Sequence, residues 1–103
     1  MKTRLGVAVA LPLLAAVALP AGAQEDYKAR AWAASCAACH GTEGRADNEM
    51  PGLAGKSKTD LANMLREFKG DKRKSATIMH QHAKGLSEDQ IDRLANYFSM
   101  QKK

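Results

Sequence analysis

The sequence has few of the residues that usually stabilise a small domain. Its 103 residues include one Trp, two Tyr, two Phe, three Pro and only two Cys. No stretch alternates apolar and polar residues long enough to indicate a strand, and no segment is repeated. The length excludes barrels, doubly wound sheets and two-lobed enzymes. The scarcity of aromatic side chains also argues against nucleic-acid binding, which uses them as stacking platforms.

The first 23 residues have the layout of a secretory signal peptide. Lys2 and Arg4 precede an uncharged apolar run at 5–19, and small residues then lead into a polar segment. The run is shorter than the roughly 20 residues that span a bilayer. We therefore expect cleavage after Ala23 and export to the periplasm, which leaves one domain at 24–103. A retained membrane anchor is the alternative.

The remaining domain is small for its thin supply of core residues. Removing 23 of the 103 residues leaves 80, and it removes two cations and no acid, so the net charge falls from +5 to +3. Domains of this size commonly depend on a disulfide, a metal or a cofactor. We therefore expect this chain to hold such a stabilising element.

Two segments after residue 24 have the composition or pattern of helices. The first, 25–34, is rich in Ala and leads directly into the two cysteines. The second can start after an N-cap at Ser57 or Thr59 and end before Gly70. Its apolar side chains recur at i, i+3, i+4 and i+7, which places them on one face: Leu61, Met64, Leu65 and Phe68.

A third helix has the clearest start in the sequence. Ser87 and Gln90 match a capping box, and Leu86 and Ile91 stand where the two members of a hydrophobic staple would pack. Together the three patterns predict an all-α domain. The segments between them, 41–56 and 70–85, are predicted as long loops, and long loops in a small domain usually carry function.

The residues with distinctive chemistry are concentrated in the run CAACH at 36–40. On a helix, residues i, i+3 and i+4 share one face, so Cys36, Cys39 and His40 could all address one flat object. A C-x-x-C-H run in an exported protein is the attachment signature of c-type haem, with two thioethers to the porphyrin and an imidazole ligand to the iron. Such a cofactor would also supply the missing core.

Other uses of the two cysteines agree less well with the sequence. A redox-active dithiol is typical of a strand–helix setting, and no strand is indicated. A disulfide across two residues would close a very small loop and add little stability. A zinc site could recruit His80 and His82, although one residue between histidines is tighter than the three to five of zinc fingers.

The sequence resembles the class I c-type cytochromes, in particular the small bacterial mono-haem members. The resemblance covers almost all of 24–103, and its landmarks are CAACHGTEG at 36–44, MPGLAG at 50–55 and TIMHQHAKGLSEDQIDRLANYF at 77–98. From 51 to 98 the sequence is most similar to the cytochrome subunits of flavocytochrome c sulfide dehydrogenases. The resemblance implies the class I cytochrome c fold, with three main helices and two long loops wrapped around one covalently bound haem.

The haem iron would need an axial ligand opposite His40. The candidates are four methionines and two histidines: Met50, Met64, Met79, Met100, His80 and His82. The resemblance places the ligand at Met79, and histidine–methionine ligation raises the reduction potential. We expect His80 and His82 to be solvated loop residues; if Met79 were not the ligand, one of them would give a bis-histidine haem.

Two further expectations come from the same resemblance. A metal-bound histidine normally donates its other ring N–H to a carbonyl, and the family pattern assigns that carbonyl to Pro51. The first and last helices of the fold pack together, and here Ala31 and Ala34 could allow the close approach. A cationic group around the second loop could steer an acidic partner surface: Lys69, Lys72, Arg73 and Lys74.

The resemblance implies a periplasmic electron carrier that accepts electrons from a sulfide-oxidising flavoprotein. No nucleophile or general-base constellation is visible, so we expect no catalysis by the chain on its own. A free-standing small cytochrome c that shuttles electrons to a terminal oxidase or another reductase is the main alternative. A haem-based ligand sensor and a non-haem metal-binding module agree less well.

Overall fold

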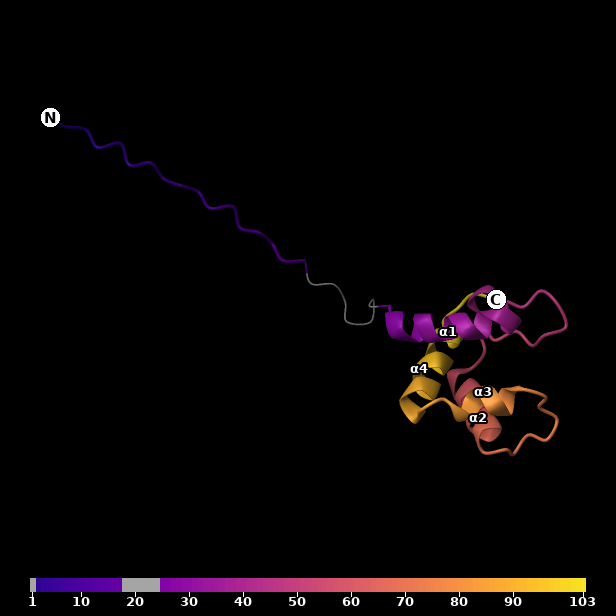
Figure 1. The fold of residues 1–103 in the computed structure, drawn as a ribbon. Coiled ribbons are helices and arrows are strands. Elements are labelled where there is room, and N and C mark those ends of the chain that lie inside the picture. Colours follow the sequence, from indigo (N-terminus) through magenta and orange to yellow (C-terminus); the bar gives the residue numbers. More distant parts are fainter. Residues whose placement is uncertain (1, 18–24) are drawn as a thin grey trace.

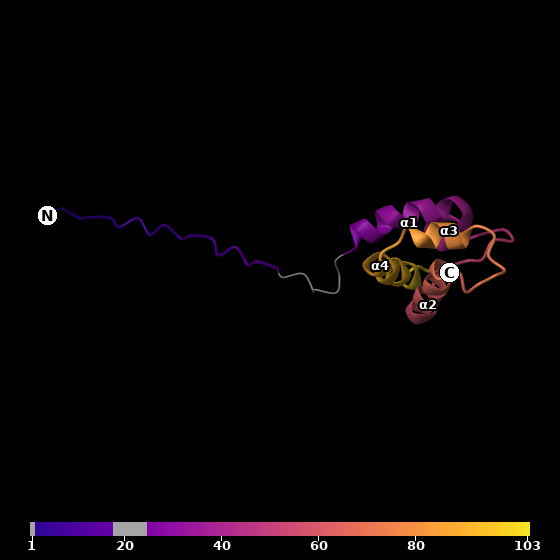
Figure 2. The same cartoon turned by 60° about the horizontal axis from the view of Figure 1, so that its bottom comes forward.

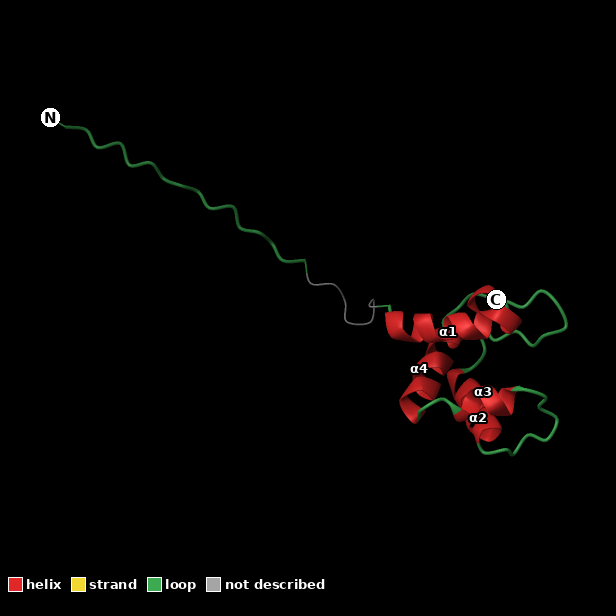
Figure 3. Cartoon of the chain, in the orientation of Figure 1, coloured by secondary structure: helices red, strands yellow, loops and turns green. Residues whose placement is uncertain are grey.

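The computed structural model describes residues 2–17 and 25–103, and all of its regular structure is helical (Figures 1 and 3). Within these residues the elements are α1 (Tyr27–His40), the 3-10 turn η2 (Thr42–Gly44), α2 (Lys58–Lys69), α3 (Met79–Lys84) and α4 (Glu88–Ser99). The all-α prediction is therefore confirmed.

The N-terminal segment 2–17 is extended, and its apolar side chains are exposed (Figure 1). The predicted cleavage point after Ala23 lies outside the described residues. Among the residues that are described, none of the helices has the length and apolar character needed to cross a bilayer.

Helix α1 begins at an aspartate cap and continues through both cysteines. The carboxylate of Asp26 accepts a hydrogen bond from the N–H of Ala29 at 3.1 Å, which satisfies one of the free amides of the first turn. The helix ends at His40, before Gly41 turns the chain with φ +81°. It is thus six residues longer at its C-terminus than the Ala-rich segment 25–34 indicated.

The caps predicted for the other two main helices are present. The hydroxyl of Ser57 accepts from the N–H of Asp60 at 3.4 Å at the start of α2, and Gly70 follows its last residue. At α4, the N–H of Gln90 donates to Ser87 Oγ at 3.1 Å, and the N–H of Ser87 donates to the Gln90 side chain at 2.9 Å. These two reciprocal bonds are a complete capping box.

The prediction of an uninterrupted loop at 70–85 is wrong at 79–84, where helix α3 forms. Ile78 precedes α3 and offers no side-chain cap, and six residues are too few to show a clear apolar stripe. Short helices draw their stability from packing. Ala83 of α3 is fully buried, and α3 packs against α2 (Figure 1).

The core lies where α4 packs against α1 and α2. Ile91 and Leu94 are its largest fully buried side chains. The buried alanines of α1 are Ala29 and Ala33, whereas Ala31 and Ala34 are exposed, which corrects the expectation that Ala31 and Ala34 allow the close approach. Alanines stand on both the buried and the exposed sides of α1 and form no clear apolar stripe, so the sequence does not reveal which of them are buried.

A partly buried ion pair joins the start of α1 to α4. Arg93 donates to both carboxylate oxygens of Asp26, at 2.6 and 2.7 Å, and its guanidinium lies 4.8 Å from the ring centroid of Trp32. The hydrogen bonds from Arg93 and then from Ala29 lower the pKa of Asp26 from 3.8 to about 2. The two helices that frame the domain are therefore connected by a charge-assisted contact as well as by apolar packing.

Candidate metal centre

The C-terminal end of α1 carries the three distinctive side chains of the CAACH run. Cys36 is half-buried against the core, Cys39 is exposed, and His40 is buried with 7% of its surface exposed. Both cysteines are free thiols. Burial raises the pKa of the Cys36 thiol above its usual value. The helix thus presents two thiols and an imidazole within one and a half turns.

The ring of His40 is fixed by a carbonyl from the first loop. Its Nδ1 lies 2.7 Å from the carbonyl oxygen of Pro51. A carbonyl can only accept, so Nδ1 carries the hydrogen, and in the neutral ring Nε2 keeps its free lone pair. That is the arrangement in which an imidazole can bind a metal through Nε2 while its orientation is held from behind.

The first loop reaches His40 because it folds back on itself at Gly44. The carbonyl of Gly44 accepts from the N–H groups of Leu53 and Ala54, at 2.8 and 3.2 Å. Gly44 has φ +78°, and a Cβ there would lie 2.8 Å from a ring carbon of Phe98. Only glycine fits at this point without strain, so this residue places the Pro51 segment beside the end of α1.

The two loops extend from the same end of the helical domain (Figures 1 and 2). His40 stands at the start of the first loop, and Met79 is the first residue of α3, at the end of the second. Met79 is half-buried, as is His80, and His82 is exposed. Sequence reasoning treated Met79 as a loop residue, but its backbone belongs to a helix.

The other methionines are less well placed than Met79 to share a metal ion with His40. Met50 and Met100 are 39% and 64% exposed. Met64 is half-buried on α2 and does not belong to the buried core cluster, although its position in the apolar stripe had suggested core packing. Burial alone therefore separates Met64 and Met79 from the other two.

A classical metal cluster does not form among the described residues. Within 2–17 and 25–103, no three His, Cys, Asp or Glu side chains come close enough to hold a metal ion. The zinc set of Cys36, Cys39, His80 and His82 is consequently not brought together. What is present is a pair of thiols next to one imidazole, which is the donor set for a porphyrin attached through thioethers.

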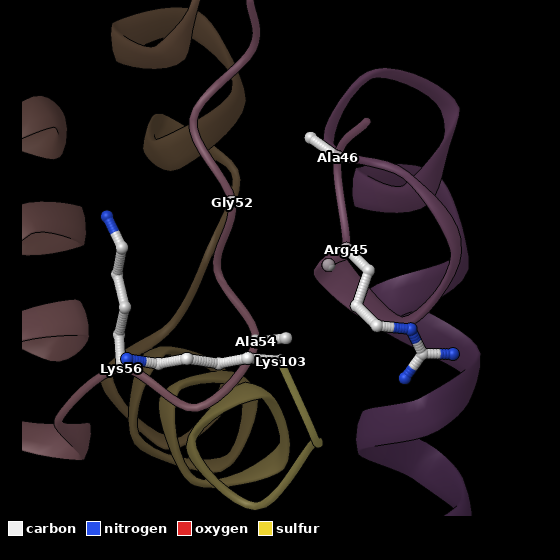
Figure 4. A pocket seen from close by; sticks show the side chains of 7 residues that line it. Arg45, Ala46, Gly52, Ala54, Lys56 and Lys103 are labelled. Atoms are coloured by element: carbon white, nitrogen blue, oxygen red, sulfur yellow. The ribbon is translucent and has the colours of Figure 1, made fainter. Parts of the chain in front are cut away.

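A cavity of about 350 Å³ lies between the segments 44–46 and 52–56, at the C-terminal residue Lys103 (Figure 4). None of the predicted haem-site residues lines it. Figure 4 shows Arg45 pointing away from Lys56 and Lys103, so these cations do not converge on one point. The nearest acid to Arg45 is Glu43, at 2.8 Å. The cavity is therefore separate from the donor set of α1.

Several cations predicted to face a partner are engaged within the domain. Arg73 pairs with Glu67 at 2.5 Å, and the ammonium of Lys69 donates to the carbonyl of Leu86. Lys72 and Lys74 are exposed and make no ion pair with any of the described residues. The positive surface of the second loop is thus smaller than its sequence indicates.

Comparison with known proteins identifies the family. A profile of the family described as Cytochrome c matches residues 27–101, which is most of the chain and includes both loops. The chain belongs to the cytochrome c family. It is a class I c-type cytochrome and an electron carrier, and members of this family hold haem c covalently. The two thiols and the oriented imidazole of this cytochrome match that requirement.

Two of the relatives are named for a part in sulfide or thiosulfate dehydrogenation. It is 42% identical over 64 residues to a protein of Chlorobaculum tepidum named the cytochrome subunit of sulfide dehydrogenase, covering 62% of this chain and 57% of that protein. It is 44% identical over 69 residues to the thiosulfate dehydrogenase electron acceptor of Thiomonas intermedia, covering 65% of this chain and 31% of that protein. The cytochrome therefore spans less than two thirds of the length of both.

A third relative is matched over more of its length. The cytochrome is 37% identical over 70 residues to cytochrome c-554(548) of Halomonas halodenitrificans, covering 65% of this chain and 84% of that protein. The three relatives confirm the resemblance drawn from the sequence landmarks, and they agree on electron transfer.

Proposed function

We propose that this cytochrome is exported, binds one haem c and accepts electrons from a sulfide-oxidising flavoprotein. Cys36 and Cys39 would hold the haem as thioethers, His40 and Met79 would ligate its iron, and Pro51 would orient His40. When bound, the haem supplies one-electron redox chemistry at a potential raised by methionine ligation. The free thiols and the hydrogen bond of His40 to Pro51 support this assignment.

The observation that carries the partner assignment is the 42% identity to the protein named the cytochrome subunit of sulfide dehydrogenase. The resemblance between 51 and 98 points to the same class of subunit. A one-electron carrier can drain a two-electron donor such as a flavin in two successive steps. The sequence of residues 1–23 supports a function in the periplasm, because it has the layout of an export signal.

Co-purification tests the partner. The cytochrome is isolated from the native periplasm, and its visible spectrum is recorded before and after sulfide is added. We expect a flavoprotein to accompany it and sulfide to reduce the haem faster than in the isolated cytochrome. Absence of a flavoprotein, together with sulfide reduction at the background chemical rate, would contradict the partner assignment and leave the electron carrier intact.

A free-standing shuttle is the second candidate. The observation that favours it is the match over 84% of cytochrome c-554(548), compared with 57% of the sulfide dehydrogenase subunit. The exposed Lys72 and Lys74 could steer such a shuttle towards an acidic partner. Ionic strength distinguishes the two candidates: transfer by a shuttle slows steeply as salt is raised, whereas transfer within a stable complex is nearly indifferent.

A further inference from the structure

The segment that leads to Met79 leaves α2 through a tight turn. The N–H of Gly70 donates to the backbone carbonyl of Arg66 at 2.9 Å, and the N–H of Asp71 donates to the backbone carbonyl of Phe68 at 3.1 Å. Asp71 adopts φ +55°, in the left-handed region that aspartate tolerates better than most residues. The backbone then runs from 72 to 78 over the surface before α3 begins.

Arg73 fastens this segment to the last turns of α2. Its Nε donates to the carboxylate of Glu67 at 2.5 Å, and its guanidinium lies 5.6 Å from the ring centroid of Phe68. Its carbonyl accepts from the N–H of Ala76 at 3.2 Å, which closes the turn directed towards Met79. Arg73 thus contacts α2 through its side chain, and its backbone carbonyl stabilises a turn in the segment that precedes Met79.

The far end of α3 is joined to the last residue of α2 and to the turn that follows it. Lys84 pairs with Asp71 at 3.1 Å, and Lys69 donates to the carbonyl of Leu86 just beyond α3. Ala83 is fully buried, which holds the middle of α3 against the domain. The first residue of α3, Met79, lacks a side-chain cap before it, so its position depends on the preceding segment.

We propose that Arg73 is the positioning residue for Met79, holding the 72–78 segment on Glu67 and Phe68 so that the methionine stays within reach of the haem iron. This inference rests on the proposed ligation by Met79. In the proposed function, ligation by Met79 sets the reduction potential of the haem. Arg73 would act by holding the 72–78 segment and would not touch the haem. An exposed arginine is used here because its planar group can pair with a carboxylate and lie over a ring at once.

The neighbouring cations supply matched controls. Lys74 lies one residue further along the same segment, is exposed, and makes no ion pair among the described residues. Lys74→Ala removes the same charge from the same segment and leaves the contacts with Glu67 and Phe68 in place. Glu67→Gln weakens the Arg73 contact from the opposite side, and Arg73→Lys keeps the charge with a poorer fit to the ring.

The test uses the haem-loaded, full-length mature cytochrome. The methionine-to-iron band of the oxidised form is followed against temperature, global unfolding is followed by helical circular dichroism, and the reduction potential is measured at 25 °C. An exposed ion pair and a cation–π contact together imply that Arg73→Ala raises the equilibrium constant for loss of the band about 3- to 30-fold. Glu67→Gln is expected to do so by a smaller factor, and Arg73→Lys to restore part of the loss.

In Arg73→Ala, the band is expected to disappear at a temperature well below that at which the helices unfold, and the reduction potential of this variant is expected to fall. Lys74→Ala is expected to behave as wild type in both measurements. Equal band stability in Arg73→Ala and Lys74→Ala would overturn the inference and leave Met79 as the ligand. Absence of the band from the wild-type protein would overturn the axial assignment and the role of Arg73 together. A parallel shift of band loss and unfolding would show that Arg73 only stabilises the fold, which also contradicts the inference.

Discussion

The Nδ1 nitrogen of His40 lies 2.7 Å from the carbonyl oxygen of Pro51, in a loop eleven residues further along the chain. This hydrogen bond settles which ring nitrogen carries the proton, because a carbonyl cannot donate. It therefore leaves Nε2 as the nitrogen with a lone pair to offer. The bond also connects the end of α1 to a loop that is itself closed by Gly44, so the orientation of the imidazole depends on both.

The first prediction concerns the two thiols. We expect the double variant Cys36→Ala/Cys39→Ala to carry no covalent haem, and each single variant to carry less than the wild type. The domain should also be strongly destabilised, since the cofactor supplies much of its core. Haem staining after denaturing electrophoresis measures the attachment. Ser35→Ala, one residue before Cys36, is the control, and unchanged staining in the double variant would refute the assignment.

The second prediction separates two half-buried methionines. Met79→Ala should abolish the methionine-to-iron band of the oxidised form and lower the reduction potential. Met64→Ala should keep the band and reduce the free energy of unfolding by about 1–2 kcal/mol, roughly half the loss at a fully buried site. Visible spectroscopy and denaturant unfolding measure the two effects. If the band persisted in Met79→Ala and changed in His82→Ala, a histidine would be the ligand instead.

The third prediction concerns the pH dependence of stability. Arg93 lowers the pKa of Asp26 from 3.8 to about 2, so the unfolded chain takes up a proton at a higher pH than the folded protein does. The stabilisation by this pair is therefore fully present above about pH 5 and is lost as the pH falls through 2.

Asp26→Asn tests this dependence with little disturbance of the helix start. Asparagine caps helices about as well as aspartate, so the contact to Ala29 is retained while the charge is lost. The variant should be less stable than wild type at pH 7, and the difference should shrink as the pH approaches 2. A difference that stayed constant between pH 7 and pH 2, measured by urea unfolding, would show that the ion pair contributes nothing.

The fourth prediction compares two glycines of the first loop. Gly44→Ala should cost about 1–3 kcal/mol of unfolding free energy, because φ is +78° and the new methyl group would meet Phe98. Gly52→Ala should change it by less than about 1 kcal/mol, since a Cβ there has its nearest neighbour at 3.6 Å. Thermal unfolding of both variants gives the comparison, and equal losses would contradict the role given to Gly44.

Local signals in the sequence indicated where α2 and α4 begin, with Ser57 as one of two candidate caps for α2, but not the Asp26 cap of α1. Ser57 and the Ser87–Gln90 pair each act within one turn, so their chemistry could be recognised without knowing the fold. Helix α3 had no comparable signal. It lacks a side-chain cap and forms by packing against α2, which is a tertiary contact.

The same distinction applies to the site. The CAACH run is local, so its two thiols and imidazole could be identified from spacing alone. The bond between His40 and Pro51 joins residues brought together by a loop, and only the family resemblance pointed to it. The contacts of Arg73 with Glu67 and Phe68 have no signal in the sequence, because a run of cations does not show which of them pair with neighbouring side chains.

The most direct test of the account is the intact mass of the protein isolated after export. We predict the mass of residues 24–103 plus one haem, unchanged by denaturation. This single value tests the removal of the first 23 residues, the covalent attachment and the number of haems. A mass equal to that of the polypeptide alone, with two thiols that react freely with an alkylating agent, would contradict the assignment of Cys36 and Cys39 as haem-binding residues.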